Sequence, residues 1–298
     1  MLILVTGARG QLGRSIKNLV KKNKTSHNFI FISRVQLDLS DLKKIKSYFD
    51  KNKFDLIINC AAYTKVDKAE IDRKQANLIN HLAVEKISEI AKNNNIKLIH
   101  ISTDFVFDGN QNIPYRENDA AFPLNIYGKS KLKGENALLS IMKFNAIIIR
   151  TSWLYSEYGN NFVETILKLA QKNSNLNVVS DQFGTPTYAS DLAEVILTII
   201  KSDKFISKDW SSGIYHYSNE GQCSWYEFAK EIVKISRSSC NIKPINTVDY
   251  PTPAKRPKYV LMSKNKLTED FGLKINFWQD SLKYCIKNLP TNSFLINE

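Results

Sequence analysis

The sequence has no long apolar run and only four cysteines, and each scarcity limits what the chain can be. No apolar stretch approaches the roughly 18 residues that cross a bilayer, so we expect no membrane-spanning segment. No basic leader precedes the short apolar stretch at the N-terminus, which predicts a cytoplasmic protein. The cysteines lie far apart without a CxxC motif, and no histidine stands near them at metal-ligand spacing, which indicates reduced structural thiols.

Acidic residues are also in the minority. The chain has 29 of them against 42 basic residues, which gives a net charge of +13. The excess is mostly lysine scattered along the whole chain, with no arginine-rich tail or long basic block. We therefore interpret it as a solvated surface and expect no nucleic-acid partner. With 298 residues, 43% of them hydrophobic, the chain is long enough to bury a large core.

The first 150 residues alternate short apolar runs with longer amphipathic ones, which is typical of parallel strands joined by helices. The predicted strands are residues 2–6, 29–33, 55–59, 96–102 and 146–150, with helices after Gln11, Asp41, Lys65 and Asn125. This pattern predicts an α/β fold with a doubly wound parallel sheet of the Rossmann type in residues 1–150. The looser pattern of residues 151–298 predicts a smaller α/β lobe for the substrate, with residues 175–205 returning to the sheet. Helices are expected there near residues 161–171, 190–201 and 224–235.

A glycine-rich segment separates the first predicted strand from the first predicted helix. Its glycines, Gly7, Gly10 and Gly13, have the spacing GxxGxxG and enclose Gln11 and Leu12. Such a turn lets the backbone approach a pyrophosphate, whose charge the open amides and the helix dipole stabilise. The segment therefore predicts dinucleotide binding, and its spacing resembles that of the short-chain dehydrogenase/reductases.

The end of the second predicted strand carries no acid. An acid there would repel the 2′-phosphate of NADP, whereas Ser33 and Arg34 offer that phosphate a hydroxyl and a guanidinium. We therefore predict NADPH as the preferred donor and NADH as the alternative. An Asp-Leu pair that resembles the adenine-covering pair of short-chain reductases follows, and small residues end the third strand. These further predicted cofactor contacts are Asp38, Leu39, Ala61, Ala62 and Tyr63.

Tyr127 and Lys131 form a YxxxK pair on a predicted helix, and Thr103 directly follows the fourth predicted strand. The i, i+4 spacing places Tyr127 and Lys131 on one helical face, where an ammonium lowers the pKa of a phenol from about 10. Together with the glycine turn, the three residues resemble the catalytic triad of the short-chain reductases. The resemblance implies that Tyr127 passes a proton to a carbonyl oxygen, that Thr103 hydrogen-bonds this oxygen, and that Lys131 also binds the nicotinamide ribose.

Longer segments spread over nearly the whole chain resemble the dTDP-4-dehydrorhamnose reductases. These segments are residues 7–13, 61–70, 102–107, 123–131, 150–155, 159–162, 181–187 and 250–257. A generic dehydrogenase would not share the last four. The resemblance implies reduction of the C4 keto group of dTDP-4-dehydro-L-rhamnose to dTDP-L-rhamnose, in nucleotide-sugar and surface polysaccharide biosynthesis.

The same resemblance assigns the substrate contacts. It implies that Thr103 and Asp104 meet the sugar and that Trp153 lies against the hexose ring, and we assign Arg256 to the substrate pyrophosphate. Some relatives carry an acid two positions after the third glycine, which supports a metal between subunits. Ser15 stands there in this chain, so we predict no metal. The family further implies a homodimer, although no stripe in the sequence marks an interface.

Other interpretations stay open at this stage. A nucleotide-sugar epimerase has the same fold and YxxxK pair but holds NAD tightly, and Arg34 argues against it. A reductase of another keto-sugar nucleotide fits the same motifs, because the base and the sugar stereochemistry depend on the shape of the pocket. The regulatory subunit of methionine adenosyltransferase resembles this family without catalysing a reduction, but the intact triad argues for chemistry.

Overall fold

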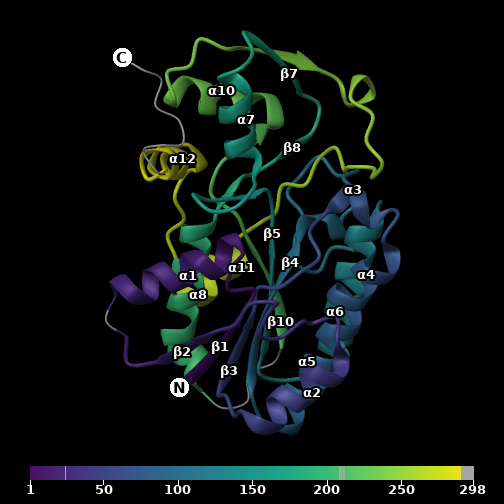
Figure 1. The fold of residues 1–298 in the computed structure, drawn as a ribbon, viewed down its shortest axis with the longest axis vertical. Helices are drawn as coiled ribbons and strands as arrows, with labels where there is room; N and C mark the ends of the chain where they lie inside the picture. The colour runs from purple at the N-terminus through teal and green to yellow at the C-terminus, as the bar shows by residue number, and fades with distance from the viewer. Residues whose placement is uncertain (24, 208–209, 211, 290–298) are drawn as a thin grey trace.

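A parallel six-stranded sheet forms the centre of the computed structural model, which describes residues 1–23, 25–207, 210 and 212–289 (Figure 1). The strands lie in the order β10-β5-β4-β3-β1-β2, and every neighbouring pair is parallel. Their bounds are β1 Leu2–Thr6, β2 Asn28–Phe31, β3 Leu56–Asn59, β4 Lys97–Thr103, β5 Ala146–Thr151 and β10 Gly213–Tyr217. The strand order reverses between β1 and β3, and open α/β sheets bind ligands at the carboxyl ends of the strands beside such a reversal.

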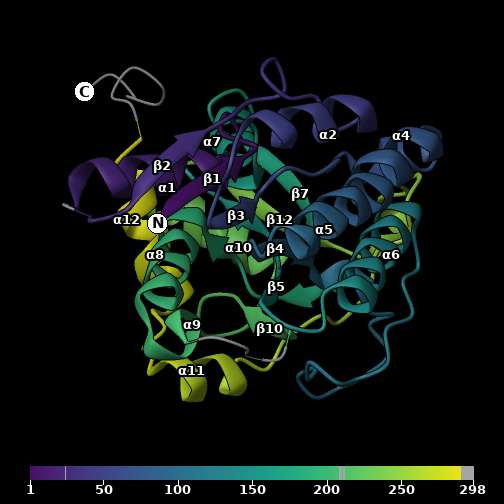
Figure 2. The same cartoon turned by 90° about the horizontal axis from the view of Figure 1, so that it is seen from below.

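Helices cover both faces of this sheet (Figure 2). Alternate strand residues point to opposite faces, so Ile147 and Ile149 join one buried cluster while Ala146 and Ile148 join another. The helices on the two faces are α1 Gln11–Lys22 and α8 Ala189–Lys201 on the first, and α2 Leu42–Lys51, α5 Ala83–Asn93 and α6 Ile126–Ile141 on the second. This is the doubly wound α/β fold that the sequence predicts.

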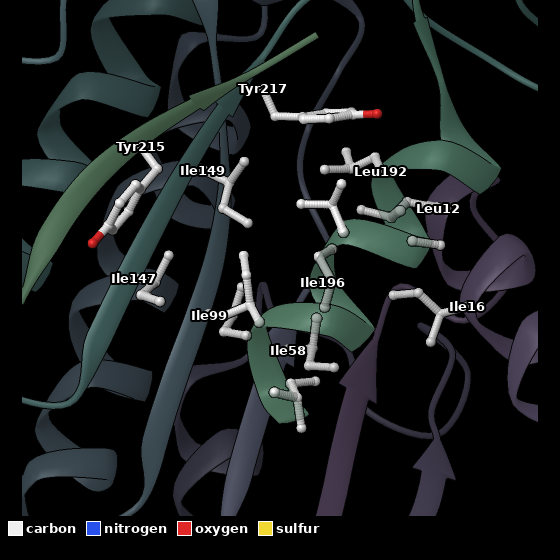
Figure 3. Packing of buried hydrophobic residues seen from close by; sticks show 14 of the residues in the cluster. Leu12, Ile16, Ile58, Ile99, Ile147, Ile149, Leu192, Ile196, Tyr215 and Tyr217 are labelled. Carbon is white, nitrogen blue, oxygen red and sulfur yellow. The ribbon is translucent and has the colours of Figure 1, made fainter. Parts of the chain in front are cut away.

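The first of these clusters shows why both helices of that face are needed. Leu12 and Ile16 of α1 lie beside Leu192 and Ile196 of α8, and all four pack against the isoleucines of the sheet (Figure 3). The four side chains are at most 4% exposed. Because α8 lies more than 160 residues after α1, the later part of the chain completes the core of the first part.

The C-terminal lobe has a separate buried cluster, in which aromatic residues such as Tyr155, Phe228 and Trp278 pack together. Its main elements are α7 Phe162–Ala170, β7 Asn175–Val179, α10 Trp225–Ile235, β12 Asn241–Ile245 and α12 Trp278–Lys287. β7 and β12 form a parallel pair, and two further strand pairs are β8 Phe183–Gly184 with β11 Cys223–Ser224, and β6 Leu154–Tyr155 with β9 Thr187–Tyr188. In Figure 1, α7 and α10 lie at the end of the molecule beyond the carboxyl ends of the central strands.

Short helices complete the fold. They are α3 Val66–Ala69, α4 Arg73–Asn77, the π-helix η1 Leu78–Leu82, the 3₁₀ turns η2 Asp104–Val106 and η3 Thr247–Asp249, α9 Asp203–Ile206 and α11 Asn265–Phe271. The five strands predicted in the first 150 residues all form, within two residues of the expected ends. The pattern predicts no strand at Gly213–Tyr217, yet β10 forms the edge of the sheet beside β5. None of the helices in the described part of the chain is both long and apolar enough to cross a membrane.

Candidate active site

The glycine turn connects β1 to α1 at the reversal of strand order. Gly7 has φ +67°, and a Cβ there would lie 2.9 Å from the Ala61 nitrogen, so only glycine fits. Gly10 is the N-cap of α1 and supplies no side-chain cap, which leaves the first amides of the helix open to an anion. The side chain of Leu12 is buried in the core, so only its backbone can serve a ligand.

Gln11, expected at the cofactor, uses its side chain elsewhere. Its amide donates to the Leu154 carbonyl at 3.2 Å and accepts from Ser156 and Asn161 at 2.9 and 3.1 Å. These contacts join the start of α1 to the C-terminal lobe. Only the backbone N–H of Gln11 is therefore available to contact a cofactor. Ser15 is buried and donates its hydroxyl to the Gln11 carbonyl.

The residues after β2 are arranged around Arg34. Its Nε pairs with Asp38 Oδ2 at 3.0 Å, and the arginine side chain is 71% exposed. Asp38 also accepts from the backbone and hydroxyl of Ser40, and these contacts lower its pKa against the effect of burial. Ser33 and Leu39 are both buried. Among these predicted cofactor residues, Arg34 is the side chain that extends most into solvent.

Asn80, which no sequence motif marks, holds the segment after β3. Its side chain accepts from the Tyr63 backbone N–H at 2.8 Å and donates to the Tyr63 carbonyl and the Ser130 hydroxyl, both at 3.0 Å. Asn80 thereby holds the backbone of Tyr63 beside α6. The sequence marks Asn80 only as one of several polar residues in a helical stretch, and its burial becomes visible only in the structure.

The predicted triad meets where β4 ends and α6 begins. Asn125 caps α6 by accepting from the Gly128 N–H at 2.8 Å, so the helix begins at Ile126, one residue before Tyr127. Tyr127 packs edge-on against Phe105, and Lys131 follows one turn later, 1% exposed. Lys131 donates to the Ile101 carbonyl at 2.7 Å, which ties α6 to β4.

Burial determines the acid strength of these groups. It raises the pKa of Tyr127 to about 12, an effect that a hydrogen bond with Thr103 reduces and the Asp104 charge increases. The expectation that Lys131 lowers the pKa of this phenol is therefore wrong, because burial outweighs the neighbouring charge. Burial lowers the pKa of Lys131 to about 8, while Glu135 opposes this shift. Asp104 accepts from the Thr103 hydroxyl at 3.0 Å, and burial raises its pKa to about 7. Tyr127 is thus a protonated phenol at neutral pH, as a proton donor must be.

Trp153 lies just beyond β5 in an unusual backbone conformation. Its φ is +44°, in the left-handed region that tryptophan rarely adopts. One face of its indole stacks on Trp225 with ring centroids 3.6 Å apart, and its edge lies against Gly184. Since one face is covered by Trp225, only the remaining surface of the Trp153 ring is left for a ligand.

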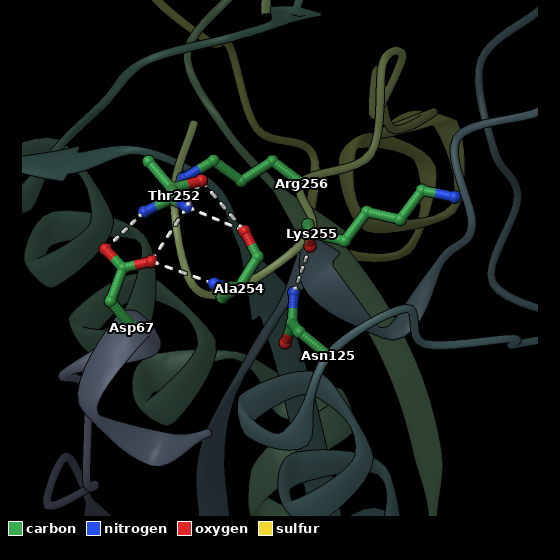
Figure 4. A network of polar contacts seen from close by, with 6 residues as sticks. All are labelled: Asp67, Asn125, Thr252, Ala254, Lys255 and Arg256. Atoms are coloured by element: carbon green, nitrogen blue, oxygen red, sulfur yellow. Dashed lines mark hydrogen bonds and ion pairs between the residues drawn. The ribbon is translucent and has the colours of Figure 1, made fainter. Parts of the chain in front are cut away.

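Arg256, expected at the substrate, is paired with Asp67 from the other half of the chain (Figure 4). Nη1 and Nη2 lie 2.9 and 2.7 Å from the two carboxylate oxygens, and Nη1 also donates to Thr252 and the Ala254 carbonyl. Nearby, Asn125 donates to the Lys255 carbonyl at 2.9 Å. These contacts hold residues 250–257 beside the N-terminal end of α6.

A cavity of about 440 Å³ opens beside this segment. Lys255, Arg256 and Lys258 contribute three cations to its lining, and Asp108 contributes one acid. A cavity of about 850 Å³ lies elsewhere, between α1, α8 and α12, and none of the predicted site residues lines it. The smaller cavity therefore has the charge to take a phosphate-bearing ligand, and Arg256 is the predicted site residue that lines it.

Comparison with known proteins gives consistent results. A family model described as the RmlD substrate binding domain matches residues 1–291. The dTDP-4-dehydrorhamnose reductase of Aggregatibacter actinomycetemcomitans is 40% identical over 287 residues, 94% of this chain and 97% of that protein. Two solved dTDP-4-dehydrorhamnose reductases, from Clostridium acetobutylicum and, in complex with NADP, from Bacillus anthracis, both have a TM-score of 0.89. Their identities are 38% and 35%, and the matches cover 96% of this chain and 99% and 98% of theirs.

Proposed function

The chain belongs to the dTDP-4-dehydrorhamnose reductase family, and on this premise we propose that it reduces the C4 keto group of dTDP-4-dehydro-L-rhamnose to dTDP-L-rhamnose. The observation that carries the proposal is that Tyr127 and Lys131 lie one turn apart on α6, with Tyr127 hydrogen-bonded to Thr103 and Lys131 bonded to the Ile101 carbonyl of β4. An NADP-bound relative supports NADPH as the donor. The open amides of α1 and the close approach of Gly7 to Ala61 fit a pyrophosphate at the turn.

The chemistry needs one proton donor next to a hydride source. NADPH bound at the glycine turn would supply the hydride. As the substrate carbonyl becomes an alkoxide, Tyr127 donates its proton to that oxygen, because an alkoxide is far more basic than a phenolate. The Thr103 hydroxyl hydrogen-bonds the same oxygen and orients it, and the Lys131 ammonium stabilises the phenolate that Tyr127 becomes.

The remaining assignments position the two ligands. Arg34 pairs with the 2′-phosphate, which its exposure and its single acidic partner permit. Asp104 and the free part of Trp153 contact the sugar. Arg256 binds the substrate pyrophosphate together with Lys255 and Lys258, which line the same cavity. Since Arg256 is paired with Asp67, substrate binding must share or replace that ion pair.

We further propose a cytoplasmic homodimer that requires neither metal nor nucleic acid. The scattered lysines support the absence of a nucleic-acid partner, and the serine at position 15 supports the absence of a metal. Light scattering of the purified protein tests the dimer, and activity after dialysis against a chelator tests the metal. A monomer, or activity lost on chelation and restored by Mg²⁺, would contradict them.

The decisive experiment measures NADPH oxidation with dTDP-4-dehydro-L-rhamnose and identifies the sugar product by NMR. Tyr127→Phe should lose at least a hundredfold in kcat and keep its NADPH affinity, because only the transferable proton is removed. Tyr226→Phe on α10 removes a hydroxyl outside the site and serves as the control. Wild-type turnover by Tyr127→Phe, or a product other than dTDP-L-rhamnose, would contradict the proposal.

A further inference from the structure

A line of buried polar groups runs from Lys131 on α6 across β4 and β3 to β1. Lys131 Nζ lies 3.3 Å from His100 Nε2, and His100 Nδ1 lies 3.1 Å from Asn59 Nδ2. The Thr6 hydroxyl donates to Asn59 Oδ1 at 2.7 Å. Each of the four residues is at most 2% exposed. Their polar groups must therefore hydrogen-bond to one another and not to water.

The sheet itself aligns three of the four groups. Thr6 is in register with Asn59 across β1 and β3, and Asn59 is in register with His100 across β3 and β4. Residues in register on neighbouring parallel strands project to the same face. The line is therefore fixed by strand pairing, and α6 adds Lys131 at its end.

The orientation of Asn59 determines where the His100 proton lies. Burial and the Lys131 charge lower the pKa of His100 well below its usual value, so the ring is neutral and carries one N–H. Asn59 Oδ1 accepts from Thr6, which turns the Asn59 amino group toward His100 Nδ1. Nδ1 must then accept, and the proton is on Nε2, which faces Lys131.

Turning the Asn59 amide over would reverse the whole line, and the contacts of Thr6 oppose this. The Thr6 oxygen already accepts from the Ala61 N–H at 3.3 Å. After a reversal the Thr6 oxygen would also accept from the Asn59 amino group. The Thr6 hydroxyl proton would then lose Asn59 Oδ1, the acceptor that it has in the described part of the structure. A buried donor without an acceptor is unfavourable, so the direction from Thr6 to His100 is preferred.

We propose that Thr6 and Asn59 hold His100 with its proton on Nε2, and that this N–H, aimed at Lys131 Nζ, makes His100 a positioning residue: Lys131 stays charged at neutral pH but gives up its proton more readily. Two N–H groups facing each other repel, whereas a neutral amine accepts from Nε2 and still donates to the Ile101 carbonyl. Burial lowers the pKa of Lys131 in the same direction. An ammonium that gives up its proton near neutral pH is also the stronger acid toward a Tyr127 phenolate one helical turn away.

Other groups around Lys131 act against this effect or carry no charge. Glu135, one turn further along α6, favours the ammonium, but Arg150 of β5 pairs with it at 2.7 Å. From η1, Asn80 contacts the neighbouring Ser130 and is uncharged. Among these groups, the N–H at His100 Nε2 is therefore the one that disfavours the charged form of Lys131.

The tautomer is measured directly by NMR of enzyme labelled with ¹⁵N-histidine, without cofactor or turnover. Comparison with His100→Gln assigns the His100 signals among the four histidines. We expect an unprotonated Nδ1 and a protonated Nε2 from pH 6 to pH 8. A proton on Nδ1 would overturn the proposal whatever reaction the enzyme catalyses. The tautomer measurement is thus independent of the proposed function. Only the role of Lys131 rests on that function.

The effect on Lys131 is measured by the alkaline limb of the kcat profile. Thr6→Val removes the hydroxyl that orients Asn59, so the line can reverse and Nε2 can accept from the ammonium. We expect this limb to move up by about one pH unit, as in His100→Gln, whose amide oxygen can accept as well. Thr6→Ser keeps the hydroxyl and should keep the wild-type limb. Identical limbs in all four proteins, with thermal melts showing folded variants, would overturn the effect on Lys131.

Discussion

Gly128 lies directly against the backbone carbonyl of Phe105, so closely that a Cβ at position 128 would be 2.1 Å from that oxygen. Phe105 belongs to η2, the turn that follows Thr103, and Gly128 follows Tyr127 on α6. The missing side chain therefore allows the helix that carries Tyr127 to approach the turn that follows Thr103. The geometry of the proposed proton donor depends on this contact.

Gly128→Ala should displace the start of α6 and lower kcat by about tenfold to a hundredfold, because a 1 Å misplacement of reacting groups costs up to about that much. Unfolding should become easier by about 1–3 kcal/mol, as for other overpacked sites. Steady-state kinetics and urea unfolding provide both values. Gly213→Ala is the matched control, since its Cβ would meet nothing closer than Lys266 Nζ at 3.5 Å. Unchanged kcat in Gly128→Ala would show that α6 can move without cost.

The sequence predicts the five strands of the first 150 residues because each is an apolar run between polar ones, a local property. β10 escapes prediction because Gly213–Tyr217 begins with glycine and contains no continuous apolar run, although its two tyrosines suit a strand once it pairs with β5. The place of α8 on the sheet also depends on contacts with residues far away in the sequence. Local patterns therefore predict strands and helices better than they predict which later segment completes the sheet.

The same distinction applies to the candidate site. Tyr127 and Lys131 are four residues apart, so helical spacing alone places them together. Asp67 and Arg256 are 189 residues apart, and no pattern in either segment predicts their ion pair. The histidine in the fourth predicted strand was visible in the sequence, but its role depends on the register of β1, β3 and β4.

Replacement of Arg34 should change the choice of cofactor. A charge-assisted phosphate contact contributes about 1.5–3 kcal/mol, so Arg34→Ala should reduce the preference for NADPH over NADH by about tenfold or more. Arg34→Asp should reduce or reverse it, because attraction to the 2′-phosphate becomes repulsion. The ratio of kcat/KM for the two cofactors is the measurement. Lys46→Asp makes the same change of charge on the exposed side of α2 and should leave the ratio unchanged. Equal use of both cofactors by the wild type would reduce Ser33 and Arg34 to a surface loop.

Arg256→Ala should raise the substrate KM by about tenfold and leave the NADPH KM nearly unchanged, since the lost contact is to the substrate pyrophosphate. Asp67→Asn should lower the substrate KM, because it releases Arg256 from a competing carboxylate. Lys243→Ala removes one cation from β12 and controls for net charge. If Asp67→Asn instead raises the substrate KM as much as Arg256→Ala does, the pair serves only to join the two parts of the chain.

Asp104 should make stability depend on pH in a direction opposite to that of most carboxylates. Its native pKa is about 7 against an ordinary value near 4, because the side chain is buried and Oδ2 has no hydrogen-bond partner in the described structure. The native state thus holds a proton that the unfolded state has already released. Stability is full below pH 4 and is lost as the pH rises toward 7.

In Asp104→Asn the side chain at position 104 is uncharged at every pH. The free energy of unfolding of this variant, minus that of the wild type, should therefore increase between pH 4 and pH 8. At about 1.4 kcal/mol for each unit of pKa, the growth should reach ~2–4 kcal/mol. Urea unfolding of both proteins without cofactor at pH 4, 6 and 8 measures it. Asp50→Asn, an exposed acid on α2, should follow the wild type. Parallel stability curves for Asp104→Asn and the wild type would mean that water or a rearrangement of Thr103 satisfies the buried carboxylate.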